Sequence, residues 1–183
     1  MNTRTTLLLA VLAVILLSFK NHSARSVRKS FVNDAPNGTV YIIIDKSSYE
    51  LNVYDADGWY ATYPVVFGNK VQTDKMMEGD RKTPEGSFRI IQKRPHDKWG
   101  KFMLLDYPNK DSWQKFNQRK ATGAIPKSAR IGGGIGIHGT WPRDETAVDY
   151  YQNWTEGCIS MKLTHLYEVY DFCPVGTKVT IKP

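Results

Sequence analysis

The chain of 183 residues is poor in cysteine, with only Cys158 and Cys173. A small exported domain held by a disulfide framework carries about four cysteines or more, so that class is excluded. One bridge between the two residues is an alternative that an oxidising compartment leaves open. Their surroundings differ, because Cys158 follows Gly157 in a turn-like stretch, whereas Cys173 ends an apolar segment before Pro174. We expect Cys173 to be a small buried hydrophobic residue.

Motifs for metals and nucleotides are missing as well. The sequence has no Cys-x-x-Cys and no His-Glu-x-x-His, and Cys158, His138 and Glu156 would make an unusual zinc site. The glycine-rich residues 132–136 lack the Lys-Ser/Thr pair that ends a phosphate-binding loop. We therefore expect no metal ion, no organic cofactor and no bound nucleotide.

Acidic residues are absent from residues 1–30, whose five basic residues supply +5 of the net charge of +7. The rest of the chain is nearly balanced, at +2. A nucleic-acid-binding domain would carry its positive charge on the folded part of the chain. We therefore expect no nucleic-acid partner.

No apolar run is long enough for an ordinary membrane span, which needs about 20 residues. The longest unbroken run covers residues 7–17 and follows Arg4, which is the pattern of an export signal. Because no clear small-x-small cleavage site follows it, we interpret residues 1–24 as a signal peptide or an uncleaved N-terminal anchor. Either one implies export to the periplasm or cell envelope, with membrane contact only through that anchor.

The remaining chain divides into a linker and one domain. Residues 25–38 are mostly polar and end in Pro36-Asn37-Gly38, which favours a linker. Residues 39–183 are long enough for a single domain with a sizeable core. The sequence does not indicate an oligomeric state.

Short apolar or alternating runs dominate this domain. Residues 55–58, Asp-Ala-Asp-Gly, predict a tight hairpin turn. Residues 112–120 and 164–172 favour short helices, the second with Thr164 as its N-cap. The expected strands are residues 40–45, 51–55, 60–67, 87–93, 102–106, 131–138 and 178–181. These elements predict a mainly β fold, a sandwich or mixed sheets with one or two short helices.

Two residues beside glycines are the candidates for chemistry. His138 ends the expected strand 131–138 and precedes Gly139, so a rigid strand end can hold its imidazole at a cleft. Cys158 follows Gly157, and the amide N–H groups of such a turn can stabilise an oxyanion. A histidine in hydrogen-bonding reach activates a thiol whose pKa is ordinarily about 8.5. The alternative is a buried structural cysteine with a hydrogen-bonded histidine.

Three motifs follow one another along the domain. Residues 79–88 read Gly-Asp-Arg-Lys-Thr-Pro-Glu-Gly-Ser-Phe, residues 138–140 read His-Gly-Thr, and residues 155–159 read Thr-Glu-Gly-Cys-Ile. In sequence and spacing they resemble the L,D-transpeptidase catalytic-domain (YkuD-like) family, over about residues 39–182. The resemblance implies a mainly β fold and acyl transfer on peptidoglycan stem peptides, in cell-wall organisation and cell shape.

The resemblance also implies residue roles. The Cys158 thiolate would attack the carbonyl of the third stem residue, usually diaminopimelate, and expel the terminal D-Ala. His138 would take the thiol proton and later activate the incoming amine or water. No cofactor is implied. The other residues implied at the site are Gly157, Thr155 and Gly139 for the oxyanion and for positioning, and Trp154, Tyr151 and Glu156 for a substrate groove.

The sequence departs from the family pattern beside the nucleophile. Glu156 stands where the family usually has histidine, and Ser160 where it commonly has arginine. Because a carboxylate beside a thiolate raises the thiol pKa, we hypothesise that Glu156 faces solvent or contacts a basic group. Two alternative functions stay open: an amidase that cleaves L,D-type links, and a non-catalytic wall-binding module.

Overall fold

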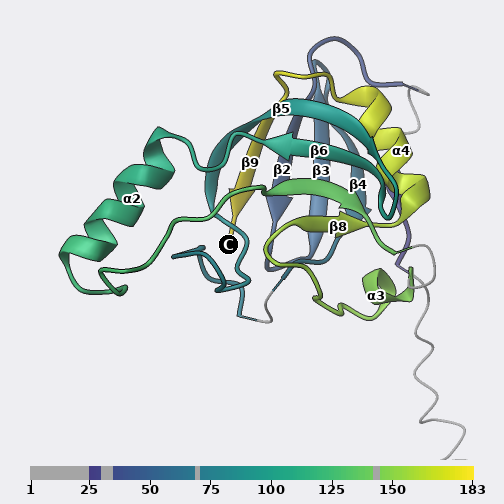
Figure 1. The fold of residues 1–183 in the computed structure, drawn as a ribbon. Coiled ribbons are helices and arrows are strands. Elements are labelled where there is room, and N and C mark those ends of the chain that lie inside the picture. The colour runs from purple at the N-terminus through teal and green to yellow at the C-terminus, as the bar shows by residue number, and fades with distance from the viewer. Residues whose placement is uncertain (1–24, 30–34, 69–70, 142–144) are drawn as a thin grey trace, which may run out of the picture.

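The structure, a computed structural model, describes residues 25–29, 35–68, 71–141 and 145–183 (Figure 1). The expected signal or anchor at residues 1–24 and part of the expected linker lie outside these ranges. Within the ranges, no helix combines the length and the apolar character that crossing a bilayer requires.

One half of the sheet is built from the two ends of the domain. Its strands, in order across the sheet, are β1 (Arg28–Lys29), β4 (Gly58–Pro64), β3 (Glu50–Asp55), β2 (Tyr41–Asp45) and β9 (Lys178–Lys182). Neighbours are antiparallel except β2 and β9, which are parallel. The predicted hairpin turn is confirmed, because the Asp57 N–H donates to Asp55 and Gly58 has a φ of 115°, where glycine is favoured.

The other half consists of β5 (Gly86–His96), β6 (Gly100–Leu105), β7 (Gly136–Gly139) and β8 (Ile159–Met161). The long strand β5 joins the halves, since it pairs with β9 at its start and with β6 after a bulge between Ile90 and Gln92. The nine strands of the described ranges form one mixed sheet, and Figure 1 shows β6, β7 and β8 crossing in front of β2, β3 and β4. A bridge between Val66 and Ser160 links β8 back to the segment after β4.

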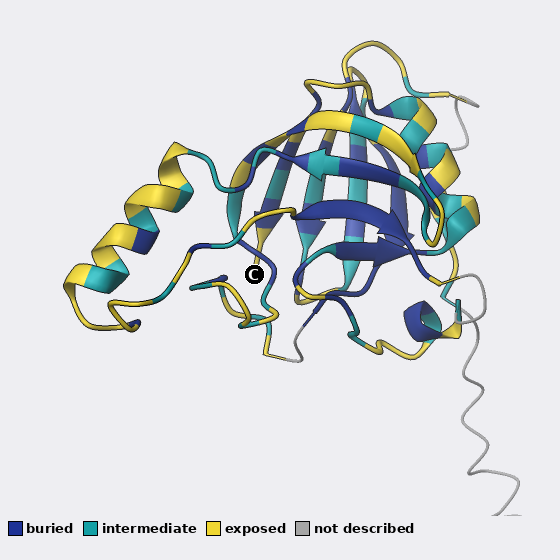
Figure 2. Ribbon diagram, viewed as in Figure 1, coloured by how far each residue is buried: buried dark blue, intermediate teal, exposed yellow. Residues whose placement is uncertain are grey.

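The core lies between the two halves of the sheet. On β2 and β3 every second side chain is buried, as expected of strands with one face on a core. β7 and β8 are buried along their whole length, as the dark blue strands in Figure 2 show. Fully buried apolar side chains from both halves meet here, among them Ile42, Ile44, Leu51, Ile90, Met103, Ile137 and Ile159. The prediction of a mainly β fold is confirmed.

Three helices lie in the described part of the chain: α2 (Lys110–Ala121), α3 (Thr146–Asp149) and α4 (Leu163–Phe172). α2 lies where a helix was predicted, and Asn109 caps it by accepting a hydrogen bond from a backbone N–H of the first turn. The predicted Thr164 cap of α4 is wrong. This helix begins one residue earlier, and the Leu163 N–H is instead satisfied by Glu145 Oε1 at 3.0 Å.

The segment before the domain contacts it wherever it is described. The Arg25 guanidinium donates to the carbonyl oxygens of Tyr49 at 2.6 Å and Val148 at 3.3 Å, and its backbone N–H donates to Asp149 at 2.8 Å. β1 then adds to the edge of β4. Residues 25–29 of the expected linker are thus part of the folded unit.

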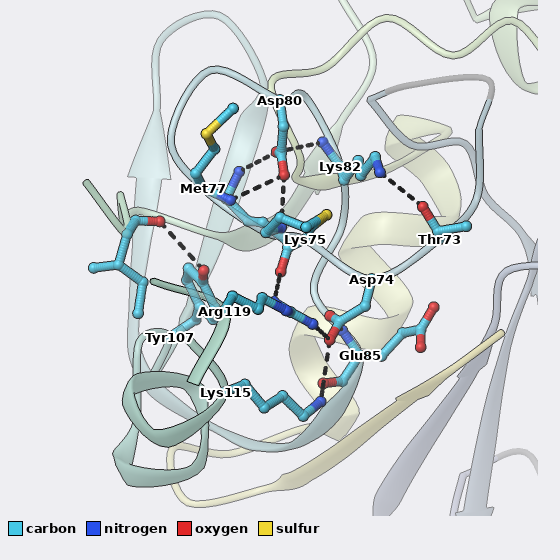
Figure 3. A network of polar contacts seen from close by, with 12 residues as sticks. Thr73, Asp74, Lys75, Met77, Asp80, Lys82, Glu85, Tyr107, Lys115 and Arg119 are labelled. Carbon is cyan, nitrogen blue, oxygen red and sulfur yellow. Dashed lines mark hydrogen bonds and ion pairs between the residues drawn. The ribbon is translucent and has the colours of Figure 1, made fainter. Parts of the chain in front are cut away.

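The loop of residues 73–86, before β5, is organised around two carboxylates (Figure 3). Asp80 accepts hydrogen bonds from the backbone N–H groups of Met76, Met77 and Lys82. It also pairs with the Lys75 ammonium at 2.8 Å; the Lys75 side chain is buried, and 9% of the Asp80 side chain is exposed. The loop is therefore held from within by one ionised side chain.

Asp74 ties the same loop to α2 (Figure 3). Its Oδ2 lies 2.7 Å from Arg119 Nη2 and 3.2 Å from Lys115 Nζ, and its Oδ1 accepts from the Glu85 N–H. Burial raises the pKa of Asp74 and of Asp80, but hydrogen bonds and cations outweigh it and hold both pKa values below the usual range. Both carboxylates stay ionised at neutral pH, so the loop is held firmly.

Candidate active site

β7 is a short strand that presents His138. It begins at Gly136 and not at residue 131, because Gly132 and Gly134 have φ values of 75° and 71°, and such backbone does not continue a strand. β7 pairs with β6 on one side and β8 on the other, and its four residues are buried. His138 is therefore held rigidly, with only 1% of its surface exposed.

The imidazole of His138 is oriented by one hydrogen bond. Its Nδ1 lies 2.8 Å from the Gly139 carbonyl oxygen, and because a carbonyl can only accept, Nδ1 carries the proton. Nε2 is then unprotonated, as a general base requires. Burial lowers the pKa of His138 to about 4, against the opposing effect of the Gly139 hydrogen bond. The ring is neutral at pH 7.

Aromatic rings enclose this imidazole. Trp99 stacks on it with ring centroids 4.2 Å apart and planes at 19°, and Trp154 meets it edge-on at 5.6 Å. His96 stacks in turn on Trp99 at 4.1 Å. These stacked rings shield the His138 imidazole from water, and this desolvation is the physical cause of its lowered pKa.

Gly139 lets the tip of the β5–β6 hairpin approach β7. Its N–H donates to the Trp99 carbonyl oxygen at 3.2 Å. A Cβ at this position would lie 2.4 Å from Leu163 Cδ2 and 2.7 Å from the same carbonyl oxygen. A side chain here would therefore displace the backbone that carries Trp99 over His138.

The turn before Cys158 is fastened by Thr155. Thr155 Oγ1 donates to the Cys158 carbonyl oxygen at 2.7 Å and accepts from the Gly157 N–H at 3.2 Å. Gly157 has a φ of 126°, and a Cβ there would lie 2.6 Å from the Lys82 carbonyl oxygen, so conformation and space both require glycine. The Gly157 N–H already donates to Thr155, so it is not available to bind an oxyanion. We therefore expect Gly157 and Thr155 to contribute by fixing the shape of the turn before Cys158.

The Cys158 thiol is half-buried and points toward the glycine-rich segment before β7. Its Sγ donates to the Gly134 carbonyl oxygen at 3.5 Å. Burial raises the pKa of this thiol, while the Gly136 N–H and the Lys75 ammonium act in the opposite direction. Cys173 lies fully buried, as predicted, with a pKa raised by burial to about 12. Both cysteines are free, so the alternative of a bridge between them is wrong.

A cavity of about 430 Å³ brings the candidate residues together. One wall comes from β5, β6 and β7, and the other from the glycine-rich segment and the turn before Cys158. The lining residues are Gln92, Arg94, Trp99, Phe102, Leu104, Gly134, His138, Trp154, Thr155, Glu156 and Cys158. Five residues proposed from the sequence therefore surround one space. In the described ranges, no group of histidine, cysteine and acidic side chains is arranged to hold a metal ion.

Glu156 reaches out of this cavity toward a cation. Its Oε1 lies 3.1 Å from Arg81 Nε, and 77% of its side chain is exposed. The same Arg81 donates from Nη2 to the Trp154 carbonyl oxygen at 3.2 Å. Glu156 thus faces solvent and contacts a basic group, as hypothesised from the sequence, and Arg81 joins the loop 73–86 to the turn before Cys158.

Tyr151 is placed away from the cavity. Its ring is covered by the Arg25 guanidinium at 4.2 Å and meets the ring of Tyr49 edge-on at 5.1 Å. Its backbone has a φ of 54°, a left-handed conformation uncommon outside glycine, which turns the residue toward the N-terminal segment. The expectation that Tyr151 lines a substrate groove does not match this position.

Sequence reasoning missed the wall that β5 and β6 contribute to the cavity. These residues alternate along the hairpin, and residues two apart on a strand share a face. Alternation alone does not say which face of the hairpin meets the candidate residues His138 and Cys158, because that depends on strand register. Here Phe102 lies opposite Arg94 on one side and His138 on the other.

Comparison with known proteins gives a consistent result. The model of the L,D-transpeptidase catalytic domain family (YkuD) matches residues 39–181. YqjB of Bacillus subtilis (strain 168), which its name presents as a candidate L,D-transpeptidase, is 29% identical over 148 residues, or 79% of this chain and 72% of that protein.

Solved structures agree at the level of the fold. The helical cell shape determining protein Pgp2 of Campylobacter jejuni has a TM-score of 0.58 at 23% identity, over 93% of this chain and 54% of that chain. An L,D-transpeptidase C442S mutant of Enterococcus faecium has a TM-score of 0.52 at 16% identity, over 80% and 50% of the two chains. The chain thus spans about half the length of these structures. With the family model matching most of its length, the chain belongs to the L,D-transpeptidase catalytic-domain family.

Proposed function

We propose that the protein is an exported cysteine acyltransferase that acts on peptidoglycan stem peptides, with Cys158 as nucleophile and His138 as its base. The observation that carries this proposal is the single cavity lined by the Cys158 thiol and by an imidazole whose Nε2 is unprotonated. Family membership supports the reaction class. Both walls of the cavity belong to the part of the chain that the family model covers.

The first half of the reaction breaks one amide and forms one thioester. As the Cys158 sulfur attacks the diaminopimelate carbonyl, the thiol proton passes to His138 Nε2. The Cys158 N–H, the amide next to the fastened Gly157, is our candidate donor to the oxyanion. Collapse of the tetrahedral intermediate then expels D-Ala, whose amine takes the proton back from His138. A thioester on Cys158 remains.

The second half consumes this thioester. His138 removes a proton from an incoming amine, which forms a cross-link, or from water, which trims the stem peptide; the C–S bond then breaks and the Cys158 sulfur takes that proton back from His138. The same base serves both outcomes, so the nature of the acceptor decides the product. The cavity that holds the donor is open to solvent through the half-buried Cys158, which gives an acceptor a route to the thioester.

Product analysis tests this proposal. The full chain and a Cys158→Ala variant are incubated with diaminopimelate tetrapeptide muropeptides and, separately, with L,D-cross-linked muropeptides, and products are identified by mass spectrometry. We expect joined diaminopimelates or loss of D-Ala with the wild-type chain and neither product with the variant. Cleavage of pre-formed L,D cross-links alone would favour the amidase, and no change in any substrate would favour a wall-binding module.

Export is part of the proposal and rests on residues 1–24, whose charged start and apolar run have the pattern of a signal or anchor. Cell fractionation of the full chain tests it. Recovery in the periplasmic or envelope fraction is the expected result, and recovery in the cytoplasm would contradict it.

A further inference from the structure

One part of the cavity lining carries a row of three side chains across three strands. Arg94 on β5 pairs with Phe102 on β6, and Phe102 pairs with His138 on β7. Directly paired residues of neighbouring strands share a face of the sheet. Neighbouring strands lie about 4.8 Å apart, so Arg94 begins roughly 10 Å from the base along this row.

The Arg94 side chain reaches back along the row. Its guanidinium carbon lies 5.0 Å from the centroid of the Phe102 ring, and that ring is nearly parallel to the His138 ring, 16° between planes, at 6.0 Å. Together these distances place the positive charge no farther than about 11 Å from the imidazole centroid. The cation therefore lies on an aromatic surface within the site, although Arg94 itself is exposed at the rim.

Of the two charged side chains that line the cavity, one has a partner of opposite charge in the described part of the chain and the other does not. Glu156 and Arg94 are the charged lining side chains, since His138 is neutral at pH 7. Glu156 is paired with Arg81. Over the described ranges of the chain, no carboxylate lies within ion-pair distance of Arg94, whose Nη1 makes a long contact of 3.5 Å to the Pro95 carbonyl oxygen. A cation on the apolar wall of Trp99, Phe102 and Leu104 attracts an anion more strongly than one in bulk water.

We propose that Arg94 binds the side-chain carboxylate of the acyl-donor residue, so that the site selects a dicarboxylic residue such as diaminopimelate. This inference rests on the proposed function. The carboxylate of the departing D-Ala is one residue, about 3.8 Å, from the carbonyl under attack. A diaminopimelate side chain carries its carboxylate farther from that carbonyl, within the cavity that both Cys158 and Arg94 line.

Lys98 provides a matched control. It lies on the same β5–β6 hairpin, carries the same charge and is likewise exposed. Its Nζ lies 5.2 Å from the centroid of the Trp141 ring, so it too packs on an aromatic side chain. Lys98 does not line the cavity. If only the positive charge of this hairpin mattered, removing the charge of Lys98 should therefore weaken binding as much as removing that of Arg94.

Calorimetric titration of the full chain carrying Cys158→Ala tests the assignment without turnover. The two probes are L-Ala-γ-D-Glu-diaminopimelate-D-Ala and the same peptide with its diaminopimelate side-chain carboxylate amidated. Adding Arg94→Gln should weaken binding of the free acid by about 10- to 100-fold, as loss of a charge-assisted hydrogen bond does, and change binding of the amide by less than about twofold. Lys98→Gln should leave both affinities within about twofold.

Three results would overturn the assignment: equal weakening of both peptides by Arg94→Gln, unchanged binding of the free acid, or no binding of either peptide to the Cys158→Ala chain. Thermal melts by circular dichroism check that each variant is folded. Failure of the proposed function gives a different result, in which the free acid binds in an Arg94-dependent way but the chain with Cys158 intact releases no D-Ala.

Discussion

At the scale of single residues, the resting site pairs two uncharged groups. Burial acts against the charged form of each, lowering the pKa of His138 to about 4 and raising that of Cys158. In the proposed mechanism, proton transfer from the thiol would therefore accompany attack on the substrate and would not precede it. A neutral pair suits a half-buried site, because no separated charges need hydration before the substrate arrives.

The buried neutral imidazole makes stability depend on pH. The pKa of His138 is about 4 in the folded chain and 6.5 when unperturbed, so between these values the unfolded chain binds more protons and the free energy of unfolding rises with pH. The contribution, about 3 kcal/mol, is present above pH 6.5 and is lost as the pH falls through 4. Urea unfolding should show the wild-type chain losing that much more stability than His138→Gln between neutral pH and about pH 4. Equal losses in the two chains would contradict this.

The Thr155 hydroxyl is expected to matter through the turn that it fastens. Thr155→Val removes both hydrogen bonds and leaves a buried N–H and a carbonyl unpaired, which should lower the free energy of unfolding by about 1–3 kcal/mol and slow D-Ala release by about tenfold or more. Thr155→Ser keeps the hydroxyl and should restore both. Denaturant unfolding and release kinetics check this, and full activity of the valine variant would count against the role.

At the scale of elements, the sequence is informative where chemistry is local. The glycines beside His138 and Cys158 indicate the candidate site, and the Asp-Gly turn between β3 and β4 indicates a hairpin, from residue type and spacing alone. The Thr164 cap failed because a distant carboxylate, Glu145, satisfies the N–H of Leu163. The cavity wall from β5 and β6 also escaped prediction, since it depends on strand register, which a bulge between Ile90 and Gln92 shifts.

The loop 73–86 should depend on Asp80 more than on its exposed charges. Asp80→Asn leaves the buried Lys75 ammonium without its carboxylate, and removing one partner of a buried pair costs about 3–5 kcal/mol. Glu78→Gln, in the same loop, breaks a pair with Arg130 in which both side chains are at least half exposed, and should change stability by less than about 1 kcal/mol. Chemical denaturation of the two variants compares them, and similar effects would argue against the network in Figure 3 as the anchor of the loop.

At the scale of the whole molecule, the two halves of the sheet meet around one core. The N-terminal segment, residues 25–29, adds β1 to the edge strand β4. β5 joins the halves at one end, and the Val66–Ser160 bridge joins them at the other. Arg25 then reaches the segments around Tyr49 and Val148. The cavity lined by Cys158 and His138 lies on the second half.

Arg25 is expected to contribute to the stability of the whole unit. Arg25→Ala removes its guanidinium hydrogen bonds and the contact with Tyr151, and should lower the free energy of unfolding by about 1–2 kcal/mol, with a Tm lower by roughly 2–8 °C. Arg28→Ala, which breaks an exposed pair with Glu50, should have a smaller effect. Calorimetric melting of the full chain measures both, and an unchanged Tm for Arg25→Ala would show that the segment adds nothing.

Acylation of Cys158 is the step on which the proposed function depends, and intact-protein mass spectrometry after rapid quenching with tetrapeptide substrate detects it. We predict a mass increase equal to the stem tripeptide acyl group, mapped to the peptide containing Cys158, retained in Cys173→Ala and absent from Cys158→Ala. His138→Gln should form the adduct far more slowly. Release of D-Ala without any adduct on Cys158, or an adduct on another residue, would contradict this mechanism.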